Sequence, residues 1–287
     1  MKYTLIAFLI CFSSHLTAQQ QSKPLRHVFQ KTTSSQIPYG NNTKAGHYAN
    51  AGDAKIYYEV YGKGEPIVLL HGGIFGATIE MARLIDSLSR TNQIIAVSTR
   101  GHGRSEIGTE PMTYEQRAKD VYSVVKEATT KKVIMLGFSD GAFTGFKYAV
   151  TYPETIKKFI AVGATELYPG MRTFQFSKEA AFNADREYFE QQLALMSEPN
   201  RWEAFATGLM KFYSGLTVDS ALFSKIQCPV LLIAGDRDDG CPVQNVINTY
   251  KMIPNCRLGI VPNGPHSVIQ THFDVVWEMV EPFIRSN

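Results

Sequence analysis

The sequence lacks CxxC pairs and clustered basic residues, and each absence argues against a class of protein. Without a CxxC pair among its four cysteines, a zinc site or a thioredoxin-like site is not expected. The 29 basic and 26 acidic residues are spread along the chain and leave a net charge of +3, so we expect no nucleic-acid partner. We also expect no metal and no organic cofactor.

The composition is that of a globular protein. Of the 287 residues, 44% are hydrophobic and 19% charged, with 13 prolines and 22 glycines. These proportions exclude a disordered chain, a collagen-like chain and a coiled coil. The length suffices for one large α/β domain or two small ones.

Residues 1–18 have the pattern of a secretory signal peptide. Lys2 precedes an apolar run, Leu5–Phe12, and the small residue Ala18 precedes the polar Gln19. The run is shorter than the roughly 20 residues that a helix needs to cross a bilayer. We therefore predict cleavage after Ala18, with an uncleaved N-terminal anchor as the alternative. The junction resembles those of Gram-negative bacteria, so we expect a secreted or periplasmic protein without a stable membrane span after cleavage.

Three cysteines, Cys228, Cys241 and Cys256, would remain after this cleavage. An odd number is unusual for an oxidising compartment. Cys228 and Cys256 each precede an apolar run, so they could form a disulfide at one edge of a sheet or remain free buried thiols.

Continuous apolar runs alternate with helix-length segments beyond a polar stretch, residues 19–45, which we interpret as a flexible leader. Residues 54–61 are rich in β-forming residues. Runs that are apolar throughout indicate strands buried on both faces, and their alternation with helices predicts a parallel sheet covered on both sides. The further runs are Ile67–Leu70, Ile94–Val97, Val133–Leu136, Phe159–Val162, Val230–Ala234 and Leu258–Val261.

One interval breaks this rhythm. Residues 165–227 contain no strong strand, are too long for an ordinary loop and carry many aromatic residues. Helical patterns span Lys178–Met196 and Arg201–Tyr213. We therefore predict a helical cap, 165–227, inserted between two parts of a core domain, 46–164 and 228–287.

The strongest local signal for chemistry is a Gly-x-Ser-x-Gly motif that spans Gly137–Gly141 and centres on Ser139. An apolar run precedes it, and helix-compatible residues, 143–150, follow it. Such a strand–turn–helix context predicts a nucleophile elbow, in which a strained turn exposes the serine hydroxyl at the end of the sheet. Glycines flank the serine because the backbones there approach too closely for a β-carbon.

A serine hydroxyl needs a base and an orienting acid before it can act as a nucleophile. His266 follows the last apolar run, and the acids Asp236, Asp238 and Asp239 follow the one before it. Both loops come after strand ends, where ligand chemistry concentrates in parallel sheets. His266 is therefore the candidate base, and the acid stays open among the three aspartates.

The motif, and the order serine, acid, histidine, resemble the α/β-hydrolase superfamily over residues 50–285. The resemblance implies an eight-stranded, mostly parallel sheet with helices on both faces and a small helical cap inserted after strand 6. The Ser-Asp-Gly elbow and the short cap look most like the biphenyl hydrolase-like (valacyclovir hydrolase-like) branch.

The resemblance also selects an acid. Gly235, Asp238 and Pro242 match the acid loop of the family, which implies that Asp238 orients the histidine and that Asp236 braces the turn. Glu166 is an alternative, since some members of the family place the acid at that point.

The segment His71–Gly76 looks like the oxyanion loop of the same family. Two backbone N–H groups would stabilise the negative charge that builds up on the substrate carbonyl oxygen. We assign one to Asp140 and the other to Gly73, with Ile74 as the alternative, and we expect Ile74 and Phe75 to contact substrate. His71 itself and the turn at residues 99–105 are interpreted as structural.

These residues predict a secreted serine hydrolase that cleaves a small carboxylic ester, its small-molecule partner, through an acyl-enzyme on Ser139. A C–C hydrolase, an amidase or a lyase with the same triad is the first alternative, because the fold supports all of these reactions. A catalytically silent, ligand-binding homologue is the second.

Asp140 follows the nucleophile directly, and two roles are open for its side chain. A carboxylate pointing into the pocket would attract a cation near the scissile carbonyl, and an α-amino group lies at that distance. Amino-acid ester hydrolases of the biphenyl hydrolase-like branch carry Asp at the matching position. Alternatively, Asp140 stabilises the positive end of the following helix.

Overall fold

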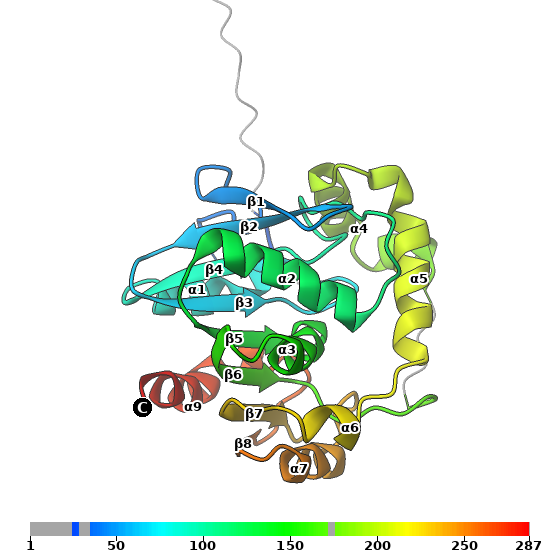
Figure 1. Cartoon of the computed structure of the whole chain (residues 1–287). Coiled ribbons are helices and arrows are strands. Elements are labelled where there is room, and N and C mark those ends of the chain that lie inside the picture. Colours follow the sequence, from blue (N-terminus) through cyan, green and yellow to red (C-terminus); the bar gives the residue numbers. More distant parts are fainter. Residues whose placement is uncertain (1–24, 29–34, 172–175, 287) are drawn as a thin grey trace, which may run out of the picture.

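In the computed structural model, which describes residues 25–28, 35–171 and 176–286, a twisted sheet of eight strands forms the centre of the molecule (Figure 1). The strands lie in the order β1-β2-β4-β3-β5-β6-β7-β8. Only the pairs β1–β2 and β2–β4 are antiparallel. The predicted mostly parallel α/β-hydrolase sheet is confirmed. The strands are β1 (Gly46–Asn50), β2 (Lys55–Tyr61), β3 (Glu65–Leu70), β4 (Asn92–Val97), β5 (Val133–Phe138), β6 (Ile156–Val162), β7 (Val230–Gly235) and β8 (Cys256–Val261).

Helices cover both faces of this sheet. Two hydrophobic clusters form the core, and successive residues of one strand enter opposite clusters: Val68 and Leu70 of β3 enter one, Ile67 and Leu69 the other. The continuous apolar runs therefore have the expected cause. Outside the cap, the helices are η1 (Thr78–Met81), α1 (Ala82–Leu88), α2 (Tyr114–Ala128), α3 (Asp140–Thr151), α7 (Val243–Met252), α8 (Val268–Thr271) and α9 (Phe273–Arg285).

The chain between β6 and β7 forms a helical layer beyond one end of the sheet (Figure 1). Its aromatic side chains, with Phe189 and Trp202 at the centre, pack edge-to-face, tilted or stacked against one another. This segment contains α4 (Lys178–Leu195), η2 (Pro199–Arg201), α5 (Trp202–Ser214) and α6 (Ser220–Phe223).

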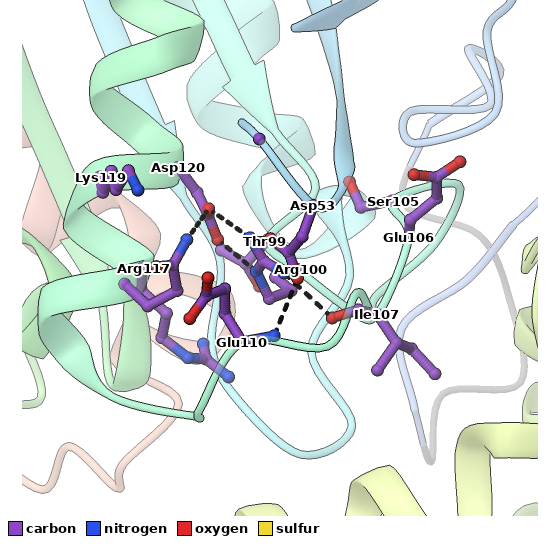
Figure 2. Close-up of polar contacts among 12 residues, drawn as sticks. Asp53, Thr99, Arg100, Ser105, Glu106, Ile107, Glu110, Arg117, Lys119 and Asp120 are labelled. Atoms are coloured by element: carbon purple, nitrogen blue, oxygen red, sulfur yellow. Dashed lines mark hydrogen bonds and ion pairs between the residues drawn. The ribbon is translucent and has the colours of Figure 1, made fainter. Parts of the chain in front are cut away.

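A buried ion cluster fixes the long loop after β4 (Figure 2). Arg100 donates two hydrogen bonds of 2.7 Å to Asp120 of α2, one of 3.0 Å to Asp53 and one of 3.2 Å to the carbonyl of Ile107. Burial favours a neutral carboxyl, but hydrogen bonds from Arg100 and from two backbone N–H groups hold the pKa of Asp53 well below its ordinary value. The loop that carries the 99–105 turn is thereby tied to α2 and to the β1–β2 turn.

The described parts of segment 19–45 differ from the flexible leader that their composition predicts. Buried Glu59 of β2 accepts the backbone N–H groups of Gly40 (2.8 Å) and Asn42 (2.7 Å), and buried Tyr39 donates to Asp86 (2.5 Å). Leu25 is only 4% exposed. A polar composition hides these contacts because single anchoring side chains, rather than a periodic apolar face, hold the segment in place.

Two further expectations concern membranes and cysteines. The predicted signal peptide, residues 1–18, lies outside the described residues. Among the described residues, no helix is both long enough and apolar enough to span a membrane. Cys228 and Cys256 are free thiols, as in the second of the two predicted states, but they are half-buried rather than buried; this burial raises their pKa values, to about 11 and about 12.

Candidate active site

Ser139 occupies a strained turn between β5 and α3. Its φ of 51° lies in the left-handed region, which a non-glycine residue rarely adopts. A β-carbon on Gly137 would lie 2.4 Å from the carbonyl oxygen of Gly141, and one on Gly141 would lie 2.3 Å from that of Leu70. Both glycines of the motif are thus required by close backbone approach, as the sequence predicts.

The structure brings Ser139, His266 and Asp238 together in one relay. Nε2 of His266 lies 2.9 Å from Oγ of Ser139, and Nδ1 lies 2.7 Å from Oδ2 of Asp238. Oδ1 of Asp238 accepts the backbone N–H groups of Gly240 (2.9 Å) and Cys241 (3.0 Å). Burial opposes the charge, but the hydrogen bond and charge of His266 and these N–H groups together lower the pKa of Asp238.

The ionised Asp238 decides which nitrogen of His266 carries the proton. A carboxylate only accepts hydrogen bonds, so Nδ1 of His266 must donate to it. In the neutral ring Nε2 is then an acceptor for the hydroxyl of Ser139. This is the arrangement in which a histidine can remove a proton from serine.

The other candidate acids have different partners. Glu166 accepts hydrogen bonds from Tyr168 (2.9 Å), Asn245 (3.1 Å) and Asn248 (2.7 Å). Asp236 lies beside the exposed Arg237, at 3.9 Å. Of the acids considered from the sequence, Asp238 is the one that contacts His266.

The loop after β3 lies against the nucleophile turn. A β-carbon on Gly141 would lie 2.6 Å from the carbonyl oxygen of His71, so the two backbones are adjacent there, and one on Gly73 would meet the side chains of Tyr213 (Oη, 2.2 Å) and Asp140 (Cβ, 2.7 Å). No hydrogen bond between described residues uses the backbone N–H group of Gly73, Ile74 or Asp140. These three N–H groups are therefore available to an oxyanion. Ile74 itself adopts a strained φ of 59°.

A pocket of about 50 Å³ lies beside Ser139. Sequence motifs mark Gly73, Ile74 and Asp140, and Tyr213 of α5 is one of the many aromatic residues of the predicted cap, but Tyr114 of α2 and Phe143 of α3 were not expected here. No local motif marks them, because an aromatic residue in a helix usually belongs to the core. The pocket is lined by Gly73, Ile74, Tyr114, Ser139, Asp140, Phe143 and Tyr213.

Phe75 lies beside the pocket at Ser139. Its ring packs edge-to-face on Phe189 of α4 at 5.2 Å, and its carbonyl accepts a hydrogen bond from Tyr188. It lines a neighbouring pocket of about 20 Å³, which shares Ile74 with the pocket at Ser139. Phe75 therefore connects the loop after β3 to the cap, and its contact with substrate stays a prediction.

Of the two roles predicted for the side chain of Asp140, the anchor for an α-amino group does not fit its position. Its carboxylate is 3% exposed, forms an ion pair with the equally buried Arg117 of α2 and accepts a hydrogen bond of 2.9 Å from Tyr114. The guanidinium neutralises the charge that a substrate cation would need. Asp140 still stands in the first turn of α3, where a negative charge is favourable.

His71 and the 99–105 turn are structural, as the sequence predicts. Nε2 of His71 accepts the backbone N–H of Thr99 (3.0 Å), and Nδ1 lies 2.6 Å from the carbonyl of Gly72. Complete burial lowers the pKa of His71 and keeps the ring neutral. It thus ties the loop after β3 to the loop after β4.

Among the described residues, one group of side chains could hold a metal ion: Asp238, Cys241 and His266, whose ligand atoms lie within 4.8 Å of one another. In this structure the carboxylate and the imidazole are hydrogen-bonded to each other through a proton. The carboxylate of Asp238 and the imidazole of His266 are therefore arranged for proton transfer.

Comparison with known proteins agrees with this geometry. The α/β hydrolase fold family matches residues 65–214. The chain belongs to this family. The match spans β3 to the end of α5 and includes the nucleophile turn.

The relatives of this α/β-hydrolase include the branch that its sequence resembles. Serine hydrolase BPHL of Mus musculus is 26% identical over 244 residues, which cover 80% of this chain and 83% of the mouse protein. The 2-hydroxy-6-oxo-6-(2'-aminophenyl)hexa-2,4-dienoic acid hydrolase of Metapseudomonas resinovorans is 23% identical and covers 82% and 85%. The enol-lactonase structure from Burkholderia xenovorans LB400 shares the fold, with a TM-score of 0.68, 18% identity and coverage of 84% and 100%.

We predict that Gly73→Ala slows covalent labelling of Ser139 by a fluorophosphonate, a reagent that phosphonylates activated serines, at least about 10-fold. The new methyl group would collide with the hydroxyl of Tyr213 and with Asp140 and displace the loop whose N–H groups are predicted to stabilise the oxyanion. The rate is measured by mass spectrometry of the intact protein. Gly208→Ala in α5 is the control, because its β-carbon would meet nothing closer than 4.0 Å; equal rates in the two variants would contradict the prediction.

Proposed function

We propose that this α/β-hydrolase is a serine hydrolase that cleaves a small, uncharged carboxylic ester through an acyl-enzyme on Ser139. The observation that carries the proposal is the relay from Oγ of Ser139 to Nε2 of His266 (2.9 Å) and from Nδ1 to Asp238 (2.7 Å). Serine alone is a poor nucleophile, and this relay supplies both the base and the group that orients it.

In the first half of the reaction, Oγ of Ser139 attacks the ester carbonyl while Nε2 of His266 takes its proton. The carbonyl oxygen becomes an oxyanion, to which the N–H groups of Asp140 and of Gly73 or Ile74 donate. The bond to the alkoxy oxygen then breaks, and the alcohol leaves with the proton from His266. Asp238 stays ionised throughout and stabilises the imidazolium.

In the second half, water attacks the acyl carbon and gives its proton to His266. A second oxyanion forms against the same N–H groups. Its collapse returns the proton to Oγ of Ser139 and releases the carboxylic acid, so the enzyme is regenerated with one water consumed.

Ser139→Ala and His266→Ala should each lower kcat for p-nitrophenyl acetate by about 10⁴-fold or more, because either change removes the nucleophile or its base. Asp238→Asn should cost more than Asp236→Asn, since only Asp238 contacts His266. Circular dichroism checks that each variant is folded. Near wild-type turnover in Ser139→Ala or His266→Ala would refute the mechanism, and the reverse ranking of the two aspartates would move the acid.

The pocket supports a short acyl group. Its volume of about 50 Å³ is small, and its aromatic lining offers apolar contact. Because Arg117 compensates the charge of Asp140, a neutral acyl group suits this pocket better than a cationic one.

We therefore expect kcat/KM to fall at least about 10-fold from p-nitrophenyl butyrate to p-nitrophenyl octanoate. The alanine ester, compared with the propionate ester after division by the uncatalysed rates, should show no preference for the α-amino group. A preference for the alanine ester that Asp140→Ala abolishes would restore Asp140 as a cation site. Equal rates on butyrate and octanoate would show that the acyl chain does not occupy this pocket.

We also propose that the protein is secreted or periplasmic, with Gln19 as its mature N-terminus. The charged start, short apolar run and small residue before a polar stretch in residues 1–21 support this proposal. Mass spectrometry of the native protein should find a chain that begins at Gln19 or within a few residues of it. Detection of residues 1–18 on the native protein would contradict the proposal.

A C–C hydrolase is the second candidate, because the relative from Metapseudomonas resinovorans is named as a dienoic acid hydrolase. The same relay would serve it. Turnover of that relative's substrate, without turnover of simple esters, would favour this candidate.

A further inference from the structure

Residues 25–28, which we call the strap, lie against both the cap and the core, although they come from the polar N-terminal segment. Leu25 (4% exposed) belongs to the cluster on one face of the sheet, and Val28 (7%) belongs to the cluster on the other. Between them, Arg26 and His27 each contact a buried acid. The strap is therefore anchored by two apolar and two charged side chains.

Arg26 forms an ion pair with the cap helix α4 at its kink. Its guanidinium donates to both carboxylate oxygens of Asp185, at 2.8 and 2.5 Å, and the two side chains are 11% and 9% exposed. Asp185 has non-helical backbone angles within α4, and it accepts the backbone N–H of Tyr188 (3.3 Å), which lies in the first turn after this kink. Buried, bidentate pairs of this kind are among the strongest charged contacts.

His27, the second charged residue of the strap, contacts Glu80 of η1. Its Nε2 lies 3.2 Å from Oε1 of Glu80, and its Nδ1 lies 2.8 Å from the carbonyl of Val28. Both nitrogens face acceptors, so the protonated ring satisfies both contacts. Burial lowers the pKa of His27, but Glu80 and the Val28 carbonyl outweigh it and raise the pKa above its ordinary value.

The partners of Arg26 and His27 both lead to the loop after β3. Oε2 of Glu80 accepts the backbone N–H of Gly72 at 2.9 Å, directly before the proposed oxyanion donors. The hydroxyl of Tyr188 donates to the carbonyl of Phe75, directly after them. The strap thus reaches Gly72 through Glu80 and Phe75 through α4, and Ile74, with its strained φ of 59°, lies between these two points.

We propose that the strap is a positioning element of the active site: Arg26 and His27 hold residues 72–75 of the oxyanion loop in their reactive conformation. The inference rests on the proposed function, since the loop matters to catalysis only if Ser139 forms an oxyanion there. A loop with one residue in a strained conformation needs contacts on both sides to hold it. Arg26 and His27 touch no reacting atom and act through Glu80, Asp185 and Tyr188.

The test compares the double variant Arg26→Ala/His27→Ala with a matched double variant, Arg186→Ala/His47→Ala. Arg186 neighbours Asp185 but is exposed and pairs with Glu190, and His47 lies exposed on β1. Ester hydrolysis gives kcat and KM. Hydrogen exchange measures the backbone N–H groups of residues 72–76, and thermal unfolding checks that each variant is folded.

We expect kcat to fall at least about 10-fold in the strap variant with little change in KM, because the oxyanion contact is made in the transition state. Exchange at residues 72–76 should speed up in the strap variant and not in the matched variant. His27→Lys, which keeps a cation facing Glu80, should retain most of the kcat that His27→Ala loses.

Each result supports or overturns the proposed role of the strap. Wild-type kcat and exchange in the strap variant would overturn the strap, as would an equal fall in kcat in the matched variant or a failure of His27→Lys to recover activity. If wild-type protein hydrolyses no ester, the proposed function fails, and faster or unchanged exchange at residues 72–76 still tells whether the strap holds the loop. If the double variant does not fold, His27→Ala and His27→Lys carry the same comparison.

Discussion

The close approach of the nucleophile turn to the end of β3 is the constraint on which the site depends. A β-carbon on Gly141 would lie 2.3 Å from the carbonyl of Leu70, and one on Gly73 would lie 2.7 Å from Cβ of Asp140. Because neither glycine carries a side chain, the loop after β3 and the first turn of α3 lie close enough to present their N–H groups to the same point. Ser139 stands at that point because its strained φ turns the chain there.

Buried charge holds the elements around this contact. Asp140 pairs with Arg117, and Arg100 pairs with Asp120 and Asp53, so α2 is fixed both to the nucleophile turn and to the loop after β4. Removing one partner of such a buried pair typically costs about 3–5 kcal/mol, because the other charge is left uncompensated. The same pairing explains why Asp140 is neutralised beside the pocket. The charges therefore stabilise the site and are not available to bind a substrate.

The sequence predicts those features that have a local signature. The strands appear as apolar runs, the nucleophile turn as spaced glycines, and His266 as a polar residue in the loop after the last strand, whereas Asp238 is distinguished from Asp236 and Asp239 only by the family resemblance. The sequence does not predict the edge strand β1, because this strand is largely exposed and has no apolar run. The pairing of Arg117 with Asp140 escapes because an arginine on α2 carries no sign of a partner more than twenty residues along the chain. The contacts of Arg26 and His27 escape for the same reason, since their partners lie in α4 and η1.

The central claim is that Ser139 carries the acyl group during turnover. The most direct measurement is rapid acid quenching of the protein during hydrolysis of p-nitrophenyl butyrate, followed by mass spectrometry. The account predicts a protein heavier by one butyryl group, with the added mass on the peptide that contains Ser139, and no such adduct in Ser139→Ala. Burst release of p-nitrophenol with the butyryl group on another residue, or an unchanged adduct in Ser139→Ala, would contradict it.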